Sequence, residues 1–199
     1  MKALILVDIQ NDFCKGGNLA VPDGEKIIPF VNQLQENEYD LIVATQDSHP
    51  QNHKSFSSNN PGTNPGDLGE LNGQPQVMWP DHCVKGTSGI EFHPELNSEK
   101  VSQVFPKGED PSVDSYSGFF DNDQKTSTGL GEYLKEKGVT EVDVVGLALD
   151  YCVKFTALDA VKLGFKTSLH LEGTRAVNLN PEDGNDAIKE LKDAGVKIL

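Results

Sequence analysis

The segment from Val142 to Gly164 constrains the fold more than any other part of the chain. It begins with a β-branched run over 142–145, apolar except for Asp143, that reaches Gly146, and apolar residues then recur at helical spacing as far as Leu163. This pattern predicts a strand, a tight turn and a helix. In a parallel α/β sheet such a joint lies at the carboxyl ends of the strands, where ligands bind.

Cys152 lies in the first turn of that predicted helix. Free backbone N–H groups and the positive end of the helix dipole favour a thiolate there, which makes Cys152 a candidate nucleophile. The alternative is a small buried residue that packs the helix on the sheet, a commoner use of a lone cysteine. The turn from Gly146 to Ala148 can direct backbone N–H groups at a developing oxyanion, and we expect Ala148 and Cys152 to form that oxyanion hole.

The rest of the chain alternates between strand and helix patterns, most clearly in its second half. This alternation predicts an α/β fold with parallel strands and right-handed crossovers. A length of 199 residues suits one full-sized core, so we expect 1–199 to form a single domain. We predict further strands over 2–7, 41–45, 101–105, 167–171 and 196–199, and further helices over 24–34, 128–137 and 181–194.

Charge and cysteine usage narrow the class of partner. A formal net charge of −14 repels nucleic acid and anionic membranes, so we expect neither as a partner, and it favours solubility and a neutral or cationic ligand. The three cysteines, at 14, 83 and 152, are too few and too far apart to form a disulfide framework. With no apolar leader and no membrane-length run, we expect a cytoplasmic protein. The oligomeric state stays open, a homo-oligomer being one option.

A long segment rich in Asn, Gly and Pro, over about 46–100, carries the metal-ligating residue types. Compact domains seldom hold so much irregular chain unless it is functional or fixed by some other group. Asp47, His49 and His53 fall within seven residues, and His82 follows later. Carboxylate and imidazole together suit a divalent metal, although histidines also occur in loops as ordinary polar surface.

Two further strands end in reactive side chains. Asp8 follows the strand over 2–7, and Lys107 follows the strand over 101–105. At one sheet edge, an acid that takes the thiol proton, a lysine that holds anions close and the nucleophile Cys152 would perform amide or ester hydrolysis. Taken singly, the acid could cap a turn and the lysine could be a surface cation.

These residues belong to motifs that resemble the nicotinamidases of the isochorismatase-like cysteine hydrolases. The resemblance covers nearly the whole chain and rests on six motifs in a fixed order. They are DIQNDF (8–13), TQDSHP (45–50), WPDHCV (79–84), KG (107–108), VDSYSGFF (113–120) and DYCV (150–153).

The resemblance implies a three-layer, Rossmann-like fold with a six-stranded, mainly parallel sheet. It implies that Asp8 is the base, Lys107 the cation beside it and Cys152 the nucleophile that forms an acyl-enzyme and releases ammonia. The implied reaction is hydrolysis of nicotinamide to nicotinate in NAD salvage, with pyrazinamide as a further substrate. A cis peptide at Leu147–Ala148 is also implied.

The resemblance further implies one divalent metal ion held by Asp47, His49 and His82. Zinc is the first choice, with manganese or iron as alternatives, and His53 is either a further ligand or a residue behind the ligands. An aromatic substrate pocket is implied at Phe13, Trp79 and Tyr116, although each of these could simply pack the core.

One residue departs from the family pattern, and three other functions compete. Leu149 replaces the small hydroxyl residue that many relatives have, which could alter substrate preference. An isochorismatase or an N-carbamoyl amidase would generally lack the Asp47, His49 and His82 group. A metal- or nucleotide-binding module without turnover is the third alternative, and the lack of a glycine-rich phosphate loop after the first strand weakens its nucleotide form.

Overall fold

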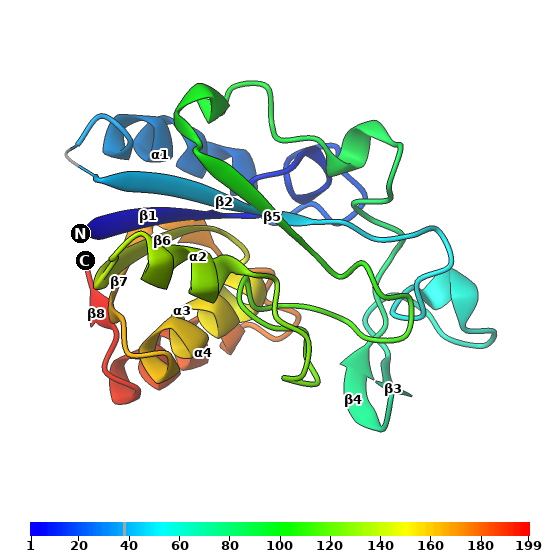
Figure 1. The fold of residues 1–199 in the computed structure, drawn as a ribbon. Coiled ribbons are helices and arrows are strands. Elements are labelled where there is room, and N and C mark those ends of the chain that lie inside the picture. The colour runs from blue at the N-terminus through cyan, green and yellow to red at the C-terminus, as the bar shows by residue number, and fades with distance from the viewer. Residues whose placement is uncertain (38) are drawn as a thin grey trace.

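The computed structural model describes residues 1–37 and 39–199, and its centre is a six-stranded sheet (Figure 1). Every strand pairing in this sheet is parallel. The predicted α/β fold with a six-stranded, mainly parallel sheet is therefore confirmed. In spatial order the strands are β5 (Gln103–Lys107), β2 (Leu41–Asp47), β1 (Lys2–Val7), β6 (Glu141–Leu147), β7 (Lys166–Arg175) and β8 (Lys197–Ile198).

Helices cover both faces of the sheet, which makes three layers (Figure 1). Successive side chains of a strand point to opposite faces, so a central strand such as β1 is apolar throughout. Leu4 and Leu6 pack in one core with α1, whereas Ile5 and Val7 pack in the other core with α2, α3 and α4. The helices are α1 (Ile28–Leu34), α2 (Leu130–Glu136), α3 (Lys154–Lys162) and α4 (Asp183–Asp193).

The direction in which successive strands are added to the sheet reverses between β1 and β6. From β1 the chain passes to β2 and then β5 on one side, while β6, β7 and β8 extend the sheet on the other. A reversal of this kind opens a crevice at the carboxyl ends of the two central strands, where ligands bind in such folds. Asp8 follows β1 and Cys152 follows β6, so both lie at this crevice.

The predicted helices are present, with two local differences. The helix predicted over 24–34 begins as a 3₁₀ turn, Gly24–Ile27, and becomes α1 at Ile28, where Pro29 fits because the first helical turn needs few backbone N–H groups. The helix predicted to hold Cys152 begins as a π-helical turn, Leu149–Val153, and continues as α3. The other two helices match their predicted bounds to within two residues.

The long connection between β2 and β5 extends beyond the carboxyl ends of the strands (Figure 1). It contains a hairpin that we did not predict, formed by β3 (Leu68–Leu71) and β4 (Gln74–Val77). Asn72 and Gly73 join the two strands and both have positive φ, as a two-residue turn of type I′ requires. The same connection contains three short 3₁₀ turns among the described residues, at Ser57–Asn59, Ser88–Ile90 and Ser98–Lys100, and another lies after β1 at Asn11–Phe13.

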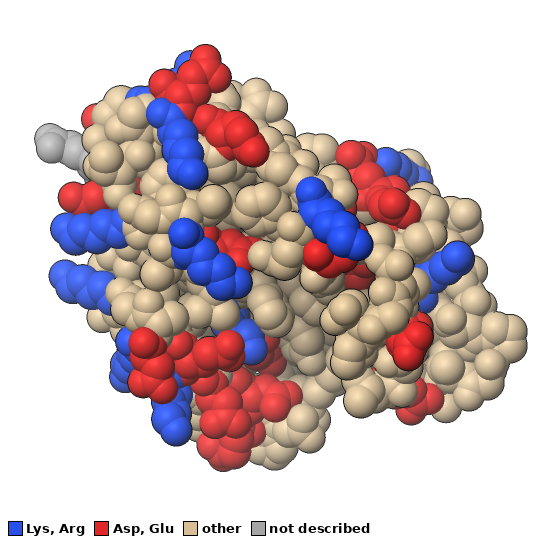
Figure 2. Space-filling model, turned by 60° about the horizontal axis from the view of Figure 1, so that its bottom comes forward, with Lys and Arg blue, Asp and Glu red and all other residues tan. Residues whose placement is uncertain are grey.

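The charged side chains are mixed on the face of the molecule drawn in Figure 2. Carboxylates gather toward the bottom of this view, and the described Lys and Arg side chains stand among them without forming an extended basic surface. None of the described helices is both long enough and apolar enough to cross a bilayer.

Candidate active site

Three elements bring Asp8, Lys107 and Cys152 together, and all three side chains are buried. Asp8 has a φ of 48°, which turns the chain away from the sheet directly after β1. Lys107 is the last residue of β5, two residues beyond the predicted strand end. Its side chain extends across the end of β2, which lies between β5 and β1, toward Asp8. Its Nζ lies 3.0 Å from Asp8 Oδ2 and 3.5 Å from Cys152 Sγ.

The hydrogen bonds of Lys107 leave one oxygen of Asp8 free. The ammonium donates to Asp47 Oδ1 at 2.9 Å, to the Ser115 carbonyl at 2.8 Å and to Cys152 Sγ at 3.5 Å, which uses its three N–H groups. Asp8 Oδ1 accepts a hydrogen bond from a threonine hydroxyl at 2.6 Å. Asp8 Oδ2 accepts no hydrogen bond from any described residue. The nearby charge of this oxygen is the Lys107 ammonium, with which it forms an ion pair.

The pKa values of these three groups reflect burial and mutual charge. Burial lowers the pKa of Lys107, but Asp47 and Asp8 outweigh it and hold that pKa well above its usual value. Burial raises the pKa of Asp8, and Lys107 offsets only part of this rise. Burial also raises the pKa of the Cys152 thiol well above its usual value despite the Lys107 cation. Burial thus opposes the thiolate that the helix start and Lys107 favour, because it penalises the charged form.

The turn before Cys152 is fixed from two sides. Gly146 has a φ of 126°, and a Cβ there would lie 2.0 Å from the Val7 carbonyl oxygen, so only glycine allows this contact. The Leu147–Ala148 peptide is cis, as the family resemblance implied. Asp150, which we had not identified as a site residue, accepts hydrogen bonds from the backbone N–H groups of Val177 and Asn178 at 2.9 and 2.8 Å. Its carboxylate ties the nucleophile turn to the segment after β7.

The three predicted metal ligands converge on one point. Asp47 Oδ2 lies 3.0 Å from His49 Nε2 and 3.2 Å from His82 Nε2. Each imidazole contacts a backbone carbonyl through Nδ1, His49 with Gly108 at 2.8 Å and His82 with Pro80 at 2.7 Å. Protons assigned to Nδ1 leave both Nε2 lone pairs facing a carboxylate, an arrangement of three acceptors that a divalent cation satisfies. The donor set therefore fits a metal ion.

His53 lies beside this group and has contacts of its own. Its Nδ1 accepts a hydrogen bond from the Ser55 N–H at 3.2 Å, and its Nε2 lies 3.3 Å from the Val113 carbonyl. The rings of His53 and His49 have centroids 4.3 Å apart. His53 can also converge with His49 and Asp114 as a second group of ligand type. Because both of its ring nitrogens are engaged, we interpret His53 as a residue that supports His49.

Asp47 connects the candidate metal ligands His49 and His82 to the group formed by Asp8, Lys107 and Cys152. Its Oδ2 faces the two histidines and its Oδ1 accepts from Lys107, so one carboxylate belongs to both. Burial raises the pKa of Asp47, but His49 and Lys107 together bring it well below its usual value. Asp47 is therefore ionised, as both a metal ligand and a partner of Lys107 must be.

The three predicted aromatic residues surround a small chamber beside Cys152. Phe13, Trp79 and Tyr116 line it together with Ala148, and its volume is about 30 Å³. Trp79 Nε1 donates to the Tyr116 hydroxyl at 3.2 Å. Other lining residues that we had not singled out include Leu19, Asp114, Tyr151 and Val177.

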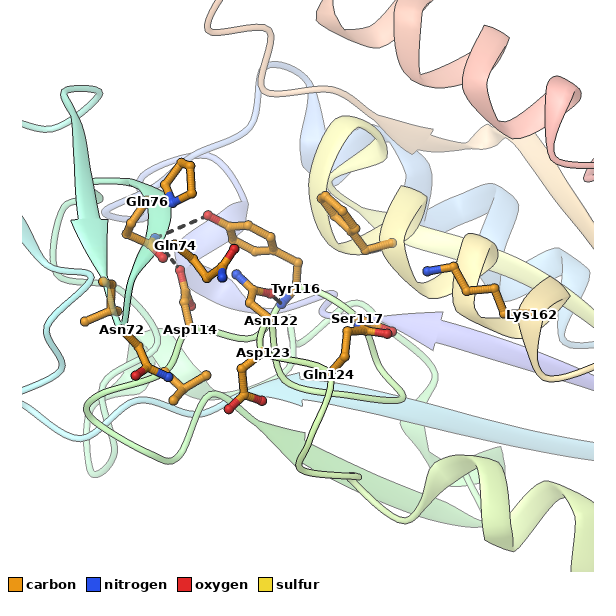
Figure 3. Close-up of a pocket in the computed structure, with 14 residues that line it drawn as sticks. Asn72, Gln74, Gln76, Asp114, Tyr116, Ser117, Asn122, Asp123, Gln124 and Lys162 are labelled. Atoms are coloured by element: carbon orange, nitrogen blue, oxygen red, sulfur yellow. Dashed lines mark hydrogen bonds between the residues drawn. The ribbon is translucent and has the colours of Figure 1, made fainter.

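Tyr116 also lines a larger outer cavity of about 320 Å³ (Figure 3). Figure 3 shows Gln76, from β4, directed at both Tyr116 and Asp114. Gln76 Nε2 donates to Asp114 Oδ2 at 2.6 Å and lies 3.3 Å from the Tyr116 hydroxyl. The hairpin therefore contacts the wall between the outer cavity and the catalytic chamber.

The three-layer α/β fold, with a buried group of Cys, Asp and Lys at the sheet's switch point, places the chain in the class of hydrolases. The model of the isochorismatase domain matches residues 2–199, and the chain belongs to this family. The resemblance seen in the ordered sequence motifs is therefore confirmed.

Individual relatives match this chain over more than nine tenths of their own length. A nicotinamidase of Escherichia coli (strain K12) is 46% identical over 99% of this chain and 93% of its own. A yeast nicotinamidase solved with the inhibitor nicotinaldehyde is 34% identical, with a TM-score of 0.94 over 100% of this chain and 99% of that one. A pyrazinamidase of Pyrococcus horikoshii solved in complex with zinc is 38% identical, with a TM-score of 0.82 over 100% and 98%.

Proposed function

We propose that this protein hydrolyses nicotinamide to nicotinate and ammonia through a cysteine acyl-enzyme, in NAD salvage, and that it also accepts pyrazinamide. The observation that carries the proposal is the position of Lys107 Nζ, which lies within 3.5 Å of Asp8, Asp47 and Cys152. One cation thereby joins a nucleophile and its base to a group of metal ligands. The similarity to the nicotinamidase of E. coli supports the choice of substrate.

In the proposed first step, Asp8 Oδ2 takes the proton of the Cys152 thiol while sulfur attacks the carboxamide carbon. The backbone N–H groups of Ala148 and Cys152 stabilise the negative charge that develops on the carboxamide oxygen. The C–N bond then breaks, and Asp8 returns its proton to the departing ammonia. The result is a thioester between Cys152 and the pyridine carbonyl group.

In the second step, Asp8 takes a proton from a water molecule that attacks the thioester carbon. The C–S bond breaks, the proton on Asp8 returns to sulfur, which restores the neutral thiol, and nicotinic acid leaves and gives its remaining acidic proton to solvent as nicotinate. Lys107 keeps its charge throughout, because its neighbours hold its pKa well above the usual value. Its role is to stabilise the thiolate as it forms and to hold Asp8 in place.

Asp47, His49 and His82 would hold one divalent metal ion, zinc in our proposal, with manganese or iron as alternatives. Such an ion supplies a Lewis acid for the ring nitrogen of the substrate when bound. The zinc complex of the P. horikoshii relative supports this assignment.

The aromatic side chains of Phe13, Trp79 and Tyr116 would enclose the pyridine ring. Leu149, the departure from the family pattern, packs in the core shared with α2 and α3 and is absent from the chamber lining. We therefore expect Leu149 to leave substrate preference unchanged.

The deciding experiment measures ammonia release from nicotinamide and pyrazinamide by the purified, zinc-loaded protein. We expect turnover with both compounds, loss of turnover after chelation and recovery when zinc is restored. Cys152→Ala should fold, retain zinc and release under about 1% of the native ammonia, since only the nucleophile is removed. An alanine variant that keeps several per cent of the native rate would refute the acyl-enzyme, and a native protein inactive on both amides would refute the substrate.

A further inference from the structure

The loop after β1 places one buried side-chain amide against the backbone of Asp47. β1 stops pairing with β2 at Val7, opposite Thr45, because Asp8 turns away from the sheet. β2 continues for two more residues and ends at Asp47. The backbone N–H and C=O of Asp47 on that side therefore lie beyond the last residue of the neighbouring strand. Buried backbone groups of this kind need another partner.

Gln10 supplies that partner. Its Nε2 donates to the Asp47 carbonyl at 2.8 Å, and its Oε1 accepts from the Asp47 N–H at 2.8 Å. The second N–H of the amide donates to the Ile90 carbonyl, also at 2.8 Å. The side chain is fully buried. The Gln10 amide thus makes the two hydrogen bonds to Asp47 that a further residue of β1 would have made.

The position of Asp47 matters in two directions at once. Its Oδ1 lies 2.9 Å from Lys107 Nζ, and its Oδ2 faces His49 and His82. A rotation of the Asp47 backbone would displace both oxygens together. We propose that Gln10 is a positioning residue that holds Asp47 as a metal ligand in register with Lys107, an inference that rests on the proposed metal site.

Only an amide can fulfil this task, because one donor and one acceptor must face a backbone C=O and N–H. Glutamate at position 10 has nearly the same shape, but its carboxylate cannot donate, and its protonated form can donate to only one of the carbonyls of Asp47 and Ile90. Methionine has a similar length and leaves both groups of Asp47 unpaired. Partners that orient metal ligands typically contribute about 10- to 100-fold in metal affinity, and we expect a loss of at least tenfold in either variant.

The test measures zinc affinity by competition with a chromophoric chelator, in native protein, Gln10→Glu and Gln10→Met. Gln46→Met is the matched control. Gln46 is next to Asp47 in sequence and donates to the same Ile90 carbonyl at 3.0 Å, but its side chain makes no described hydrogen bond to Asp47. We expect the Gln46 variant to bind zinc within twofold of native protein. Chemical denaturation of the zinc-free proteins separates a loss of stability from a loss of affinity.

The outcomes are distinct. Native affinity in a folded Gln10→Met variant would overturn the inference and leave the metal site intact. A native protein that binds no zinc would overturn the metal site and the inference together. If neither Gln10 variant folds, hydrogen exchange of the native protein decides, because coupling between two sites is reciprocal. Slower exchange of the Asp47 amide when zinc is bound supports the role of Gln10, and equal exchange with and without zinc overturns it.

Discussion

Replacement of Lys107 by methionine tests how far one buried cation controls the nucleophile. Two unit charges separated by the 3.5 Å between Nζ and Sγ attract by about 5 kcal/mol at an effective dielectric constant of about 20. Part of this loss is offset, because Asp8 lies 3.0 Å from Nζ and takes up a proton once the cation is gone. If about half of the energy remains uncompensated, the thiolate fraction of Cys152 falls about fiftyfold near pH 7.

The assay is the rate of alkylation of Cys152 by a small neutral thiol reagent, followed by mass spectrometry of the peptide that contains it, as a function of pH. Loss of the cation raises the pKa of the thiol, so the curve for Lys107→Met should move to higher pH. Lys85→Met is the control, because Lys85 pairs with Glu109 at the exposed surface and such pairs contribute under about 1 kcal/mol. Superimposable curves for native protein and a folded Lys107 variant would refute the electrostatic role of the lysine.

Three further changes test other parts of the structure. Asp8→Asn should reduce ammonia release at least about a hundredfold, since an amide cannot accept the thiol proton; near-native turnover would exclude Asp8 as the base. Asp47→Ala should lower zinc content in metal analysis, and full occupancy would exclude it as a ligand. Asp143→Asn should destabilise the protein near neutral pH, because Tyr39 and His170 donate to this carboxylate. Burial raises the pKa of Asp143, but its hydrogen-bond partners lower it to about 2, so this stability is present above about pH 4 and is lost toward pH 2. The difference in urea midpoint between native protein and variant should therefore shrink over that range, and a constant difference would contradict this.

The sequence was sufficient for the sheet because its signal is local. β1 is a nearly continuous apolar run, as a strand covered on both faces must be, and β6 is mainly apolar apart from Glu141 and Asp143. The bounds of β5 were less clear, since we ended this strand at Phe105 before Pro106. The strand continues to Lys107 because β5 lies at the edge of the sheet, where a proline without an N–H is tolerated.

The β3–β4 hairpin could have been found from the sequence and was not. Asn72–Gly73 is a strong signal for a two-residue turn of type I′. Its flanking strands have only four residues each and are largely exposed, so they lack the alternating apolar pattern that identifies a strand. Hairpins with little core contact are easily missed when apolar periodicity is the main criterion.

The membership of the site was predictable for a geometric reason. In a parallel sheet, the residues that follow different strands meet at one edge, which brought Asp8, Lys107 and Cys152 together before any contact was known. The roles of Gln10 and Asp150 were not predictable in this way. Both lie within the ordered motifs, but each acts through backbone groups of a distant segment, and the sequence does not show which segment that is.

The burial of Cys152 bears on how the proposed nucleophile would be generated. A helix start favours a thiolate only where solvent or other donors share the charge, whereas this sulfur is enclosed by the protein. Burial raises the pKa of the Cys152 thiol and also the pKa of Asp8, its proposed proton acceptor, because burial penalises the charged form of each group. Proton transfer to Asp8 must accompany attack on the carboxamide, when the developing negative charge passes to the substrate oxygen and no isolated thiolate needs to exist.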